Sequence, residues 1–363
     1  MAATVGANLS ALRGHNAALV LDLLRTAGEP GISRLELAER TGLTPQAVSK
    51  ITARLRADGL VVEAGRRAST GGKPRTVLRL LAGAGHAVGL HLDRDELHTV
   101  LADLSGAVVA ARRAPLDLGA GADAVLGAAA CEVDALLDAE AARTVLGVGV
   151  AVPGPLDHAA GVLHRVTGFP QWDGFPLRDA LAERLGLPVV VDKDTNAAAL
   201  GLALEGEGAR SFAYLHLGTG LGAGLVLDGS LYRGARTGAG EFGHQVIQLD
   251  GPVCGCGNRG CIEALCLAAV ASGGLEEAAR VLGEGAANLV SLLDIDAVLL
   301  GGRTVAAHEE CFVRGVERVM AARAHREGGA PTIPVRAAPG GESQAAEGAA
   351  HMILAPMFGR DSV

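Results

Sequence analysis

The order of apolar and polar positions divides the chain into two parts. Through about residue 80, apolar stripes at helical spacing predict short helices. The first stripe lies within residues 16–26, and the glycines and proline of residues 28–31 end it. Beyond residue 86, short runs of Val, Leu and Ala predict strands that alternate with helices. The pattern therefore indicates a small helical module followed by a larger α/β body.

Two helix-start signals follow each other closely in the first part. Ser33 with Glu36 three residues later forms a capping box for a helix over residues 34–40. After a short turn that contains glycine, Thr44 caps the next helix and Pro45 takes its first position. A helix, a short turn and a second helix are the arrangement of a helix-turn-helix.

The second of these helices has one apolar face and one polar, basic face. Val48, Ile51 and Leu55 predict the buried face. Strands over residues 59–63 and 76–80 flank a Gly-rich basic turn and predict a wing. A helical module that binds a protein partner is the alternative to a winged helix that binds DNA. The residues that we expect to contact DNA are Thr44, Gln46, Ser49, Lys50 and Arg54 on the helix, and Lys73 and Arg75 on the wing.

The second part predicts two α/β lobes around a cleft. Strand hairpins followed by βα units occur in both halves of this part. We expect a DNA-binding domain at 1–82, a first lobe at 83–190 and a second lobe at 191–339, with a C-terminal helix within 340–363 that returns to the first lobe. The expected strands are 87–92, 97–103, 107–112, 145–152, 189–191, 212–217, 224–227 and 297–300, and the expected helices are 122–137, 177–185 and one from 197 onward.

Charge is distributed unevenly, and this strengthens the DNA-binding interpretation. The formal net charge is -8, but residues 1–80 carry 12 Lys and Arg against 6 Asp and Glu, so this part is +6 and the remainder is -14. A basic head on an acidic body is the charge pattern of a tethered DNA-binding module, although a merely lopsided surface is the alternative. Aromatic residues make up only 2% of the chain, which argues against binding of single strands by base stacking.

The sequence predicts neither a signal peptide nor a membrane span. The N-terminal apolar stretch is interrupted by Arg13 and Asp22, and no charge-free apolar run is long enough to cross a bilayer. We therefore expect a cytoplasmic protein without a membrane partner, in which six cysteines favour metal binding over disulfides.

Three cysteines lie within eight residues, at Cys254, Cys256 and Cys261. Glycines between them allow the loop to fold around an ion, and zinc prefers four soft ligands in a tetrahedron. His244, ten residues upstream of Cys254, is one candidate for the fourth ligand, and Cys266 is another. Free thiols without a metal remain the alternative.

Several segments together resemble the ROK family of repressors, open reading frames and kinases. They are Gly240-Glu241-Phe242-Gly243-His244, the segment from Cys254 to Glu263, Asp194-Thr195-Asn196-Ala197-Ala198, Gly218-Thr219-Gly220 and Gly301-Gly302. The N-terminal winged helix resembles the repressor branch of the family. The resemblance implies an actin/hexokinase-like, ribonuclease H-like body with a sugar in its cleft.

Carried over to this chain, the resemblance implies sugar contacts at Asp194, Glu241, His244 and Glu263. It also implies a structural Zn²⁺ held by His244, Cys254, Cys256 and Cys261, which would orient Glu263. Lys193 departs from the family, whose sugar-binding members have Asn at this position. A cation here would change which sugar fits, favour an acidic sugar, or pair with Asp192 or Asp194 and block binding.

The function expected from this sequence is a sugar-responsive regulator, with an operator in duplex DNA as its partner and a repressor as the expected type. We expect a homodimer or a tetramer, because one head reads only one half-site. The resemblance also allows a phosphotransferase-system protein as a partner. A regulator that senses zinc is a further class, although a closed site of four protein ligands is expected to bind too tightly for sensing.

The main alternative is an ATP-dependent sugar kinase, with Asp194 as its catalytic base. In kinases of this family a Gly-Gly-Thr loop lies close to the phosphates. The matching segment here contains Asp93, Asp95 and Glu96 and lacks those glycines, so it would repel ATP. We therefore expect no kinase activity.

Overall fold

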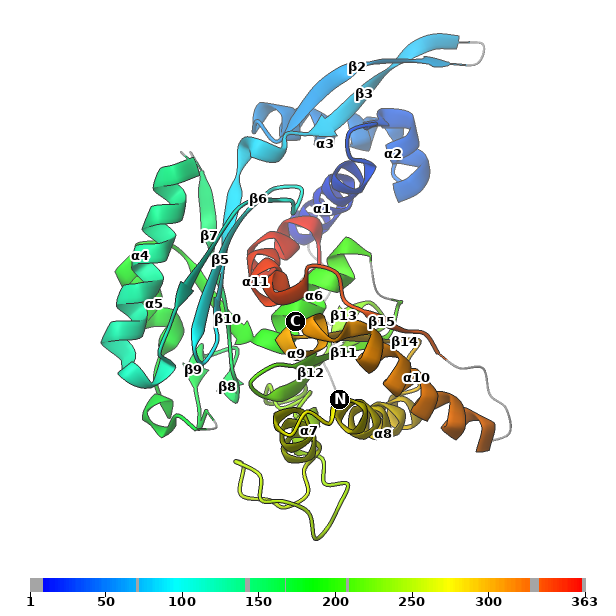
Figure 1. The fold of residues 1–363 in the computed structure, drawn as a ribbon. Helices are drawn as coiled ribbons and strands as arrows, with labels where there is room; N and C mark the ends of the chain where they lie inside the picture. Colours follow the sequence, from blue (N-terminus) through cyan, green and yellow to red (C-terminus); the bar gives the residue numbers. More distant parts are fainter. Residues whose placement is uncertain are drawn as a thin grey trace.

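The structure is a computed structural model that describes residues 9–69, 72–140, 144–166, 168–206, 209–326 and 333–360. Figure 1 shows a winged head at one end of a body built from two sheets, with helices between and outside them. The mixed α/β architecture with an N-terminal helix-turn-helix agrees with the expectation from sequence. No helix among the described residues is long and apolar enough to cross a membrane.

The head contains three helices and a three-stranded sheet in the order β1-β3-β2. Its capping box is formed as predicted, because the Glu36 N–H donates to Ser33 Oγ at 3.3 Å and the Ser33 N–H donates to Glu36 Oε2 at 2.8 Å. The wing strands are longer than the sequence predicted. The elements are α1 (Leu9–Ala27), β1 (Ile32–Ser33), α2 (Arg34–Thr41), α3 (Pro45–Ala57), β2 (Val61–Ser69) and β3 (Gly72–Leu80).

The first lobe is a five-stranded sheet in the order β10-β7-β4-β5-β6. Helices α4 and α5 cover one face, and the C-terminal helix α11 covers the other (Figure 1). Strand β10 belongs to this sheet along its whole length, through Lys193. The elements are β4 (His86–Leu92), β5 (Glu96–Asp103), β6 (Val108–Pro115), α4 (Ala122–Glu140), β7 (Val145–Val152), β8 (Leu156–Asp157), β9 (Val162–Leu163), α5 (Leu177–Leu185), β10 (Val189–Lys193) and α11 (Gln344–Leu354).

The second lobe is another five-stranded sheet, in the order β13-β12-β11-β14-β15. Helices α7, α8 and α10 pack on one face, and α6 packs on the other. The sequence analysis identified the strands β11, β12 and β14 but not the helices between residues 262 and 326. The elements are α6 (Asp194–Glu205), β11 (Phe212–Leu217), β12 (Leu221–Leu227), β13 (Ser230–Leu231), α7 (Ile262–Ala271), α8 (Leu275–Leu293), β14 (Ala297–Gly301), α9 (Arg303–Ala307), α10 (Glu309–Arg326) and β15 (Val335–Ala337).

The start of α6 corrects one prediction. The sequence predicted a helix from residue 197, but α6 begins at Asp194. The Asp194 carboxylate accepts a hydrogen bond from the Thr195 N–H at 2.6 Å, so it satisfies one of the free amide groups in the first helical turn. The earlier start places Asp194 directly at the end of strand β10, where the two lobes meet.

Helices α6 and α11 join the lobes through direct backbone contacts. A Cβ atom at Gly348 of α11 would overlap the carbonyl oxygen of Ala197 in α6. In the same way, Gly149 of β7 lies against the backbone of Ala349 in α11. Such close packing leaves no space for even one methyl group.

We therefore expect Gly348→Ala to lower the free energy of unfolding by about 1–3 kcal/mol, because the added methyl group forces α6 and α11 apart. The matched control is Gly83→Ala, at a glycine where no atom lies within 4 Å of the added Cβ and where φ is not positive. Urea denaturation of both variants measures the effect. Equal midpoints for the two variants would show that the helix junction tolerates the methyl group.

The head is packed onto the body through α1. Val20, Leu21 and Leu24 share one apolar cluster with Leu354 and Phe358 near the C-terminus, and with residues of β5. Arg25 is largely buried, and its guanidinium lies 5.1 Å from the centre of the Phe358 ring. It also donates to the carbonyl oxygen of Leu204, at the end of α6, at 3.2 Å. A cation at the C-terminal end of a helix is favourable, so Arg25 stabilises this contact between α1 and α6.

Candidate functional site

The exposed face of α3 carries the predicted DNA contacts. Gln46, Ser49, Lys50 and Arg54 are all exposed, whereas Val48, Thr52 and Leu55 are buried against the head. The Thr44 side chain caps the helix, because its hydroxyl accepts from the Ala47 N–H at 3.2 Å. The structure thus brings the predicted helix residues together on one solvent-facing surface.

The wing places a further predicted contact nearby. Arg75 is exposed on β3, opposite Arg67 of β2 in the strand register. Arg67 is held by Glu36 at 3.2 Å and by the carbonyl oxygen of Pro30 at 2.8 Å, so its guanidinium has partners within the head. The Lys73 backbone belongs to β3, but its side chain and the wing tip at residues 70–71 lie outside the described part of the chain.

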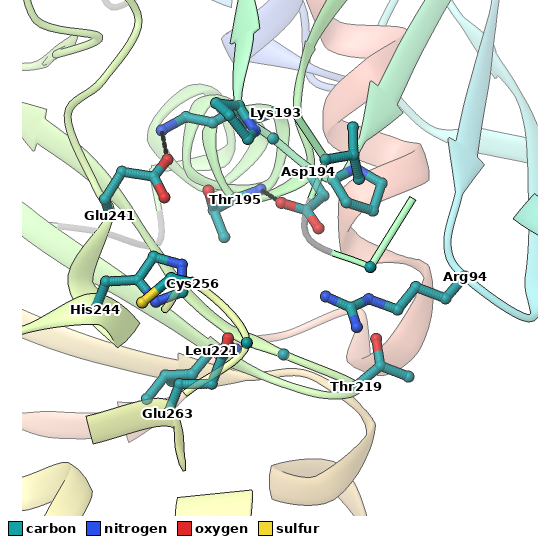
Figure 2. A pocket seen from close by; sticks show the side chains of 18 of the residues that line it. Arg94, Lys193, Asp194, Thr195, Thr219, Leu221, Glu241, His244, Cys256 and Glu263 are labelled. Carbon is teal, nitrogen blue, oxygen red and sulfur yellow. Dashed lines mark hydrogen bonds and ion pairs between the residues drawn. The ribbon is translucent and has the colours of Figure 1, made fainter. Parts of the chain in front are cut away.

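A cavity of about 780 Å³ lies between the two lobes. The sugar contacts implied by the resemblance, Asp194, Glu241, His244 and Glu263, all line it, as does Lys193. Figure 2 shows these side chains around one open space, with Glu241, His244 and Glu263 on one side and Asp194 and Arg94 on the other. The cavity is large enough for a monosaccharide together with a substituent.

Lys193 lies in this cavity with its charge already paired. Its ammonium group donates to Glu241 Oε1 at 3.1 Å and to the carbonyl oxygen of Ala239, and its side chain is 4% exposed. The suggested pairing with Asp192 or Asp194 is therefore not the one observed. Asp192 is instead bound by Arg233 at 2.7 Å and by Asn196 at 2.8 Å. The Lys193–Glu241 pair fixes one carboxylate of the cleft from the opposite lobe (Figure 2).

The two other carboxylates of the cleft are held at helix starts. Burial is the main cause that raises the pKa of Asp194, and the nearby Asp93 raises it further. Glu263 lies in the first turn of α7, where a negative charge is favourable. Its Oε2 accepts from the Leu221 N–H at 2.9 Å, which fixes the carboxylate against the loop that precedes β12.

His244, Cys254, Cys256 and Cys261 converge beside Glu263. One ligand atom from each lies within 4.8 Å of all the others. Bonds of ~2.3 Å to a tetrahedral Zn²⁺ give ligand separations of about 3.8 Å. The observed 3.7 Å between Cys256 Sγ and Cys261 Sγ, and 3.7 Å between Cys254 Sγ and His244 Nδ1, fit this geometry. Cys266, the other candidate, is buried in α7 and directs its thiol to the carbonyl oxygen of Ala278.

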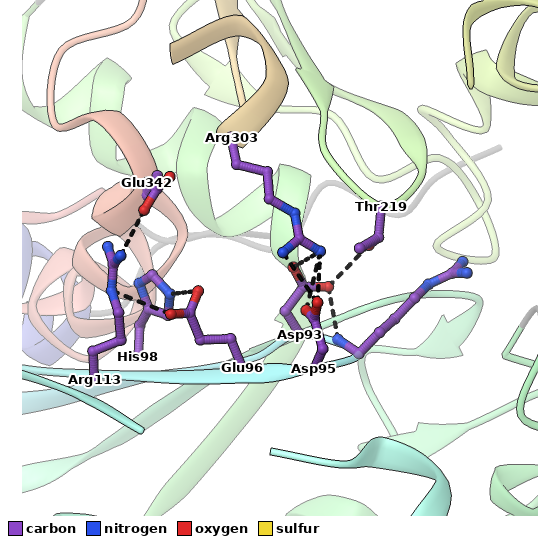
Figure 3. A network of polar contacts seen from close by, with 9 residues as sticks. Asp93, Asp95, Glu96, His98, Arg113, Thr219, Arg303 and Glu342 are labelled. Atoms are coloured by element: carbon purple, nitrogen blue, oxygen red, sulfur yellow. Dashed lines mark hydrogen bonds and ion pairs between the residues drawn. The ribbon is translucent and has the colours of Figure 1, made fainter. Parts of the chain in front are cut away.

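A group of ion pairs around Arg303 also connects the two lobes. Arg303, at the start of α9, pairs with Asp95 at 3.0 Å and with Asp93 at 4.0 Å, and both aspartates belong to the turn between β4 and β5 (Figure 3). Thr219 of the second lobe donates to Asp93 Oδ1 at 3.2 Å. This group occupies the region between the two glycine-containing loops, Gly218–Gly220 and Gly301–Gly302.

Comparison with known proteins now decides the family. The sequence profile of the ROK family matches residues 88–270, just over half of the 363 residues. The chain belongs to the ROK family. A winged helix-turn-helix DNA-binding profile matches residues 20–62, within the head.

Curated relatives of this ROK chain include three regulators. It is 30% identical over 236 residues to the xylose repressor of Caldicellulosiruptor bescii (64% of this chain, 59% of that protein) and 29% identical over 243 residues to that of Bacillus subtilis (64% and 61%). It is 30% identical over 263 residues to the DNA-binding transcriptional dual regulator NagC of Escherichia coli K12 (71% and 64%). The matches span about three fifths of each of these proteins.

Solved structures of ROK proteins show the same fold. A ROK family transcriptional regulator, a homologue of the E. coli MLC protein, superposes with a TM-score of 0.77 at 23% identity, over 96% of this chain and 97% of that one. A ROK glucokinase from Streptomyces griseus, in complex with glucose and AMPPNP, superposes with a TM-score of 0.64 at 26% identity, over 74% of this chain and 98% of that one. The kinase therefore matches a part of this chain, and the regulator nearly all of it.

Three arginines with important contacts in this ROK chain, two at the cleft and one between head and body, were not identified from the sequence. Arg94 points into the cleft, Arg303 joins the lobes and Arg25 joins head and body. The signal for Arg303 was its position directly after Gly301–Gly302. No local pattern indicates these roles for Arg94 or Arg25, because the contacts that define them, with Phe169 for Arg94 and with Leu204 and Phe358 for Arg25, are distant in sequence.

Proposed function

We propose that this chain is a sequence-specific DNA-binding transcriptional regulator, a repressor of carbohydrate genes, that acts in the cytoplasm and responds to a sugar. The single observation that supports this most is the exposed face of α3, where Lys50 and Arg54 make no contact that neutralises them within the described head. A basic, solvent-facing helix beside a wing is suited to the major groove of duplex DNA. The names of the relatives agree with this role.

The domain limits proposed for this function are 1–82 for the head, 83–193 for the first lobe and 194–339 for the second, with the C-terminal helix on the first lobe. The limit expected at 190 moves to 193, because β10 pairs within the first sheet through Lys193. One head reads one half-site, and half-sites lie ~34 Å apart, so we propose a homodimer or a tetramer as the DNA-binding form. A phosphotransferase-system protein is kept as a second proposed partner.

In the cleft, Asp194, Glu241, His244 and Glu263 are proposed to bind the hydroxyl groups of the sugar. Carboxylates accept hydrogen bonds from neighbouring hydroxyls. The His244 Nδ1 lies toward Cys254, so Nε2 is left for the sugar. A Zn²⁺ held by His244, Cys254, Cys256 and Cys261 would fix this tautomer and the loop beside Glu263, as a structural ion with no open position.

Helix α6 connects the cleft directly to the head. It begins with Asp194 and Thr195 in the cleft, and its last turn accepts the hydrogen bond from Arg25 of α1. A sugar that displaces the start of α6 therefore displaces the surface on which α1 rests. Regulation also requires that the sugar binds more tightly to the state that cannot bind DNA.

The kinase alternative is disfavoured by the group around Arg303. Phosphoryl transfer depends on holding the phosphates of the nucleotide. In this chain Asp93 and Asp95 place carboxylates in the region between the two glycine-containing loops, and Arg303 is paired with them (Figure 3). ATP would have to break these ion pairs and then face two aspartates.

The experiment selects DNA from random duplexes with the purified full-length chain. We expect enrichment of a two-fold symmetric sequence, and about tenfold weaker binding to it when the cognate sugar is added. Xylose, glucose, N-acetylglucosamine and their phosphates form the first panel, each also incubated with ATP. If no sequence is enriched, or if ATP is consumed steadily with one of these sugars, the proposal is wrong.

A further inference from the structure

The cations that line the cleft differ in whether they have an acidic partner. Lys193 is paired with Glu241, and Arg165 lies 3.7 Å from Asp173 at the exposed rim. Arg94, in contrast, forms no ion pair within the part of the chain that the structure describes. It is partly buried, so its charge has lost some of its water without a compensating carboxylate.

The position of Arg94 is fixed from several sides. Its backbone N–H donates to Asp93 Oδ1 at 2.7 Å, and its carbonyl oxygen accepts from the Leu118 N–H at 3.1 Å. The guanidinium lies 5.8 Å from the centre of the Phe169 ring, a cation–π contact. Figure 2 shows the guanidinium directed into the cavity, on the same side as Asp194 and close to Thr219 in this view. Arg94 is thus held in place before any ligand arrives.

The negative charges closest to Arg94 are largely compensated. Arg303 pairs with Asp93 and Asp95 on the same turn, and Lys193 pairs with Glu241 across the cavity. The Asp194 carboxylate accepts a hydrogen bond from the Thr195 N–H at 2.6 Å, at the positive start of α6. An anionic group beside Arg94 therefore meets a guanidinium whose neighbouring aspartates, Asp93 and Asp95, are already paired with Arg303.

A neutral sugar uses this guanidinium only in part, because hydroxyl oxygens are weaker acceptors than the oxygens of a phosphate or a carboxylate. Ring hydroxyls are served by the carboxylates and the imidazole on the other side of the cavity (Figure 2). Guanidinium groups bind phosphate and carboxylate through two parallel hydrogen bonds, which are stronger than those between neutral groups. The cavity of about 780 Å³ accommodates a substituent in addition to the ring.

We propose that the ligand of this cleft is a monosaccharide that carries an anionic group, a phosphate or a carboxylate, and that Arg94 binds this group. The inference rests on the proposed function, since it specifies the chemical class of the sugar that the regulator senses. Arg94 then determines specificity, whereas Glu241, His244 and Glu263 hold the ring.

The test measures binding to the full-length chain by calorimetry, with the emission of Trp172, the single tryptophan, as a second signal. Trp172 is buried in the core of the first lobe, in the segment whose Pro170 and Asp173 line the cleft. The probes are glucose, glucose 1-phosphate, glucose 6-phosphate, glucuronate, N-acetylglucosamine and its 6-phosphate. We expect at least one anionic sugar to bind about tenfold or more tightly than its neutral parent. The phosphates and glucuronate distinguish the two kinds of anionic group.

Arg94→Gln should lower the affinity for the preferred anionic sugar by about 30-fold and the affinity for its neutral parent by less than about threefold. Arg94→Lys keeps the charge but cannot form the two parallel hydrogen bonds. Its affinity for the anionic sugar should lie between that of Arg94→Gln and that of the unchanged chain. The matched control is Arg165→Gln, which removes the same charge from a side chain that is 89% exposed at the same cavity and should change affinity by less than about threefold.

The proposal is overturned if no anionic sugar binds, if neutral parents bind equally well, or if Arg94→Gln weakens both classes alike. DNA binding of the same samples is measured in parallel. A chain that binds its operator but no anionic sugar refutes only this inference, whereas a chain that selects no DNA refutes the proposed function.

Discussion

Replacement of both Lys50 and Arg54 by alanine lowers the affinity of the chain for its operator by about 100- to 1000-fold. Both side chains are exposed on the face of α3 that also carries Gln46 and Ser49. A contact to a base edge contributes about 1–3 kcal/mol, and each phosphate contact contributes about one unit to the salt dependence of binding. Fluorescence anisotropy with a labelled operator at several salt concentrations measures both quantities.

A matched control removes the same charge elsewhere. Arg314 and Arg318 are exposed on α10 in the body, and their replacement by alanine should change operator affinity by less than about threefold. Circular dichroism verifies that both double variants are folded. If the Lys50 and Arg54 variant binds the operator as tightly as the control and with the same salt slope, α3 is not the recognition helix.

Replacement of Cys256 by serine is expected to abolish metal binding and to weaken the affinity for the sugar by about 100-fold or more. In the proposed zinc site, His244, Cys254, Cys256 and Cys261 would bind one ion and so hold together the loop that lies beside Glu263. Structural zinc contributes roughly 10–16 kcal/mol to the folding of small zinc-dependent units, so its loss unfolds this loop and releases His244. Native mass spectrometry measures the metal content, and calorimetry measures the sugar affinity.

Cys131→Ser is the control, because Cys131 is an exposed thiol on α4 of the first lobe. It should retain one zinc ion per chain and the full response to sugar. DNA binding without sugar should survive in both variants, since the head lies far from the cluster in the fold (Figure 1). A metal-free unchanged chain, or a Cys256→Ser variant that still responds to sugar, would contradict the proposed role of zinc.

The parts of the structure that depend on neighbouring residues were predictable from the sequence. The capping box of Ser33 and Glu36 and the start of α3 at Thr44 and Pro45 were confirmed, since all their contacts lie within a few residues. The helix α7 was not predicted, because it is apolar on nearly every face and shows no polar stripe. The sugar contact at Glu263, in the first turn of this helix, was implied only by the family resemblance.

Contacts between distant residues could not be predicted. The sequence suggested an unusual charge at Lys193, but its partner Glu241 is 48 residues away, and the pair Arg303–Asp95 spans 208 residues. Spacing alone left Cys266 open as an alternative to His244 for the fourth ligand. The three-dimensional arrangement separates them, because Cys266 faces the backbone of α8 and His244 faces the other three thiols.

The packing of α1 has a consequence for the construction of chimaeric regulators. Val20, Leu21, Leu24 and Arg25 contact the C-terminal segment and the end of α6, so α1 packs against the body as well as against the rest of the head. A head transplanted from another protein with its own first helix would meet a foreign surface at Phe358 and Leu204. An exchange of operator specificity that keeps α1 with the body, and replaces only the segment from α2 through the wing, preserves this contact.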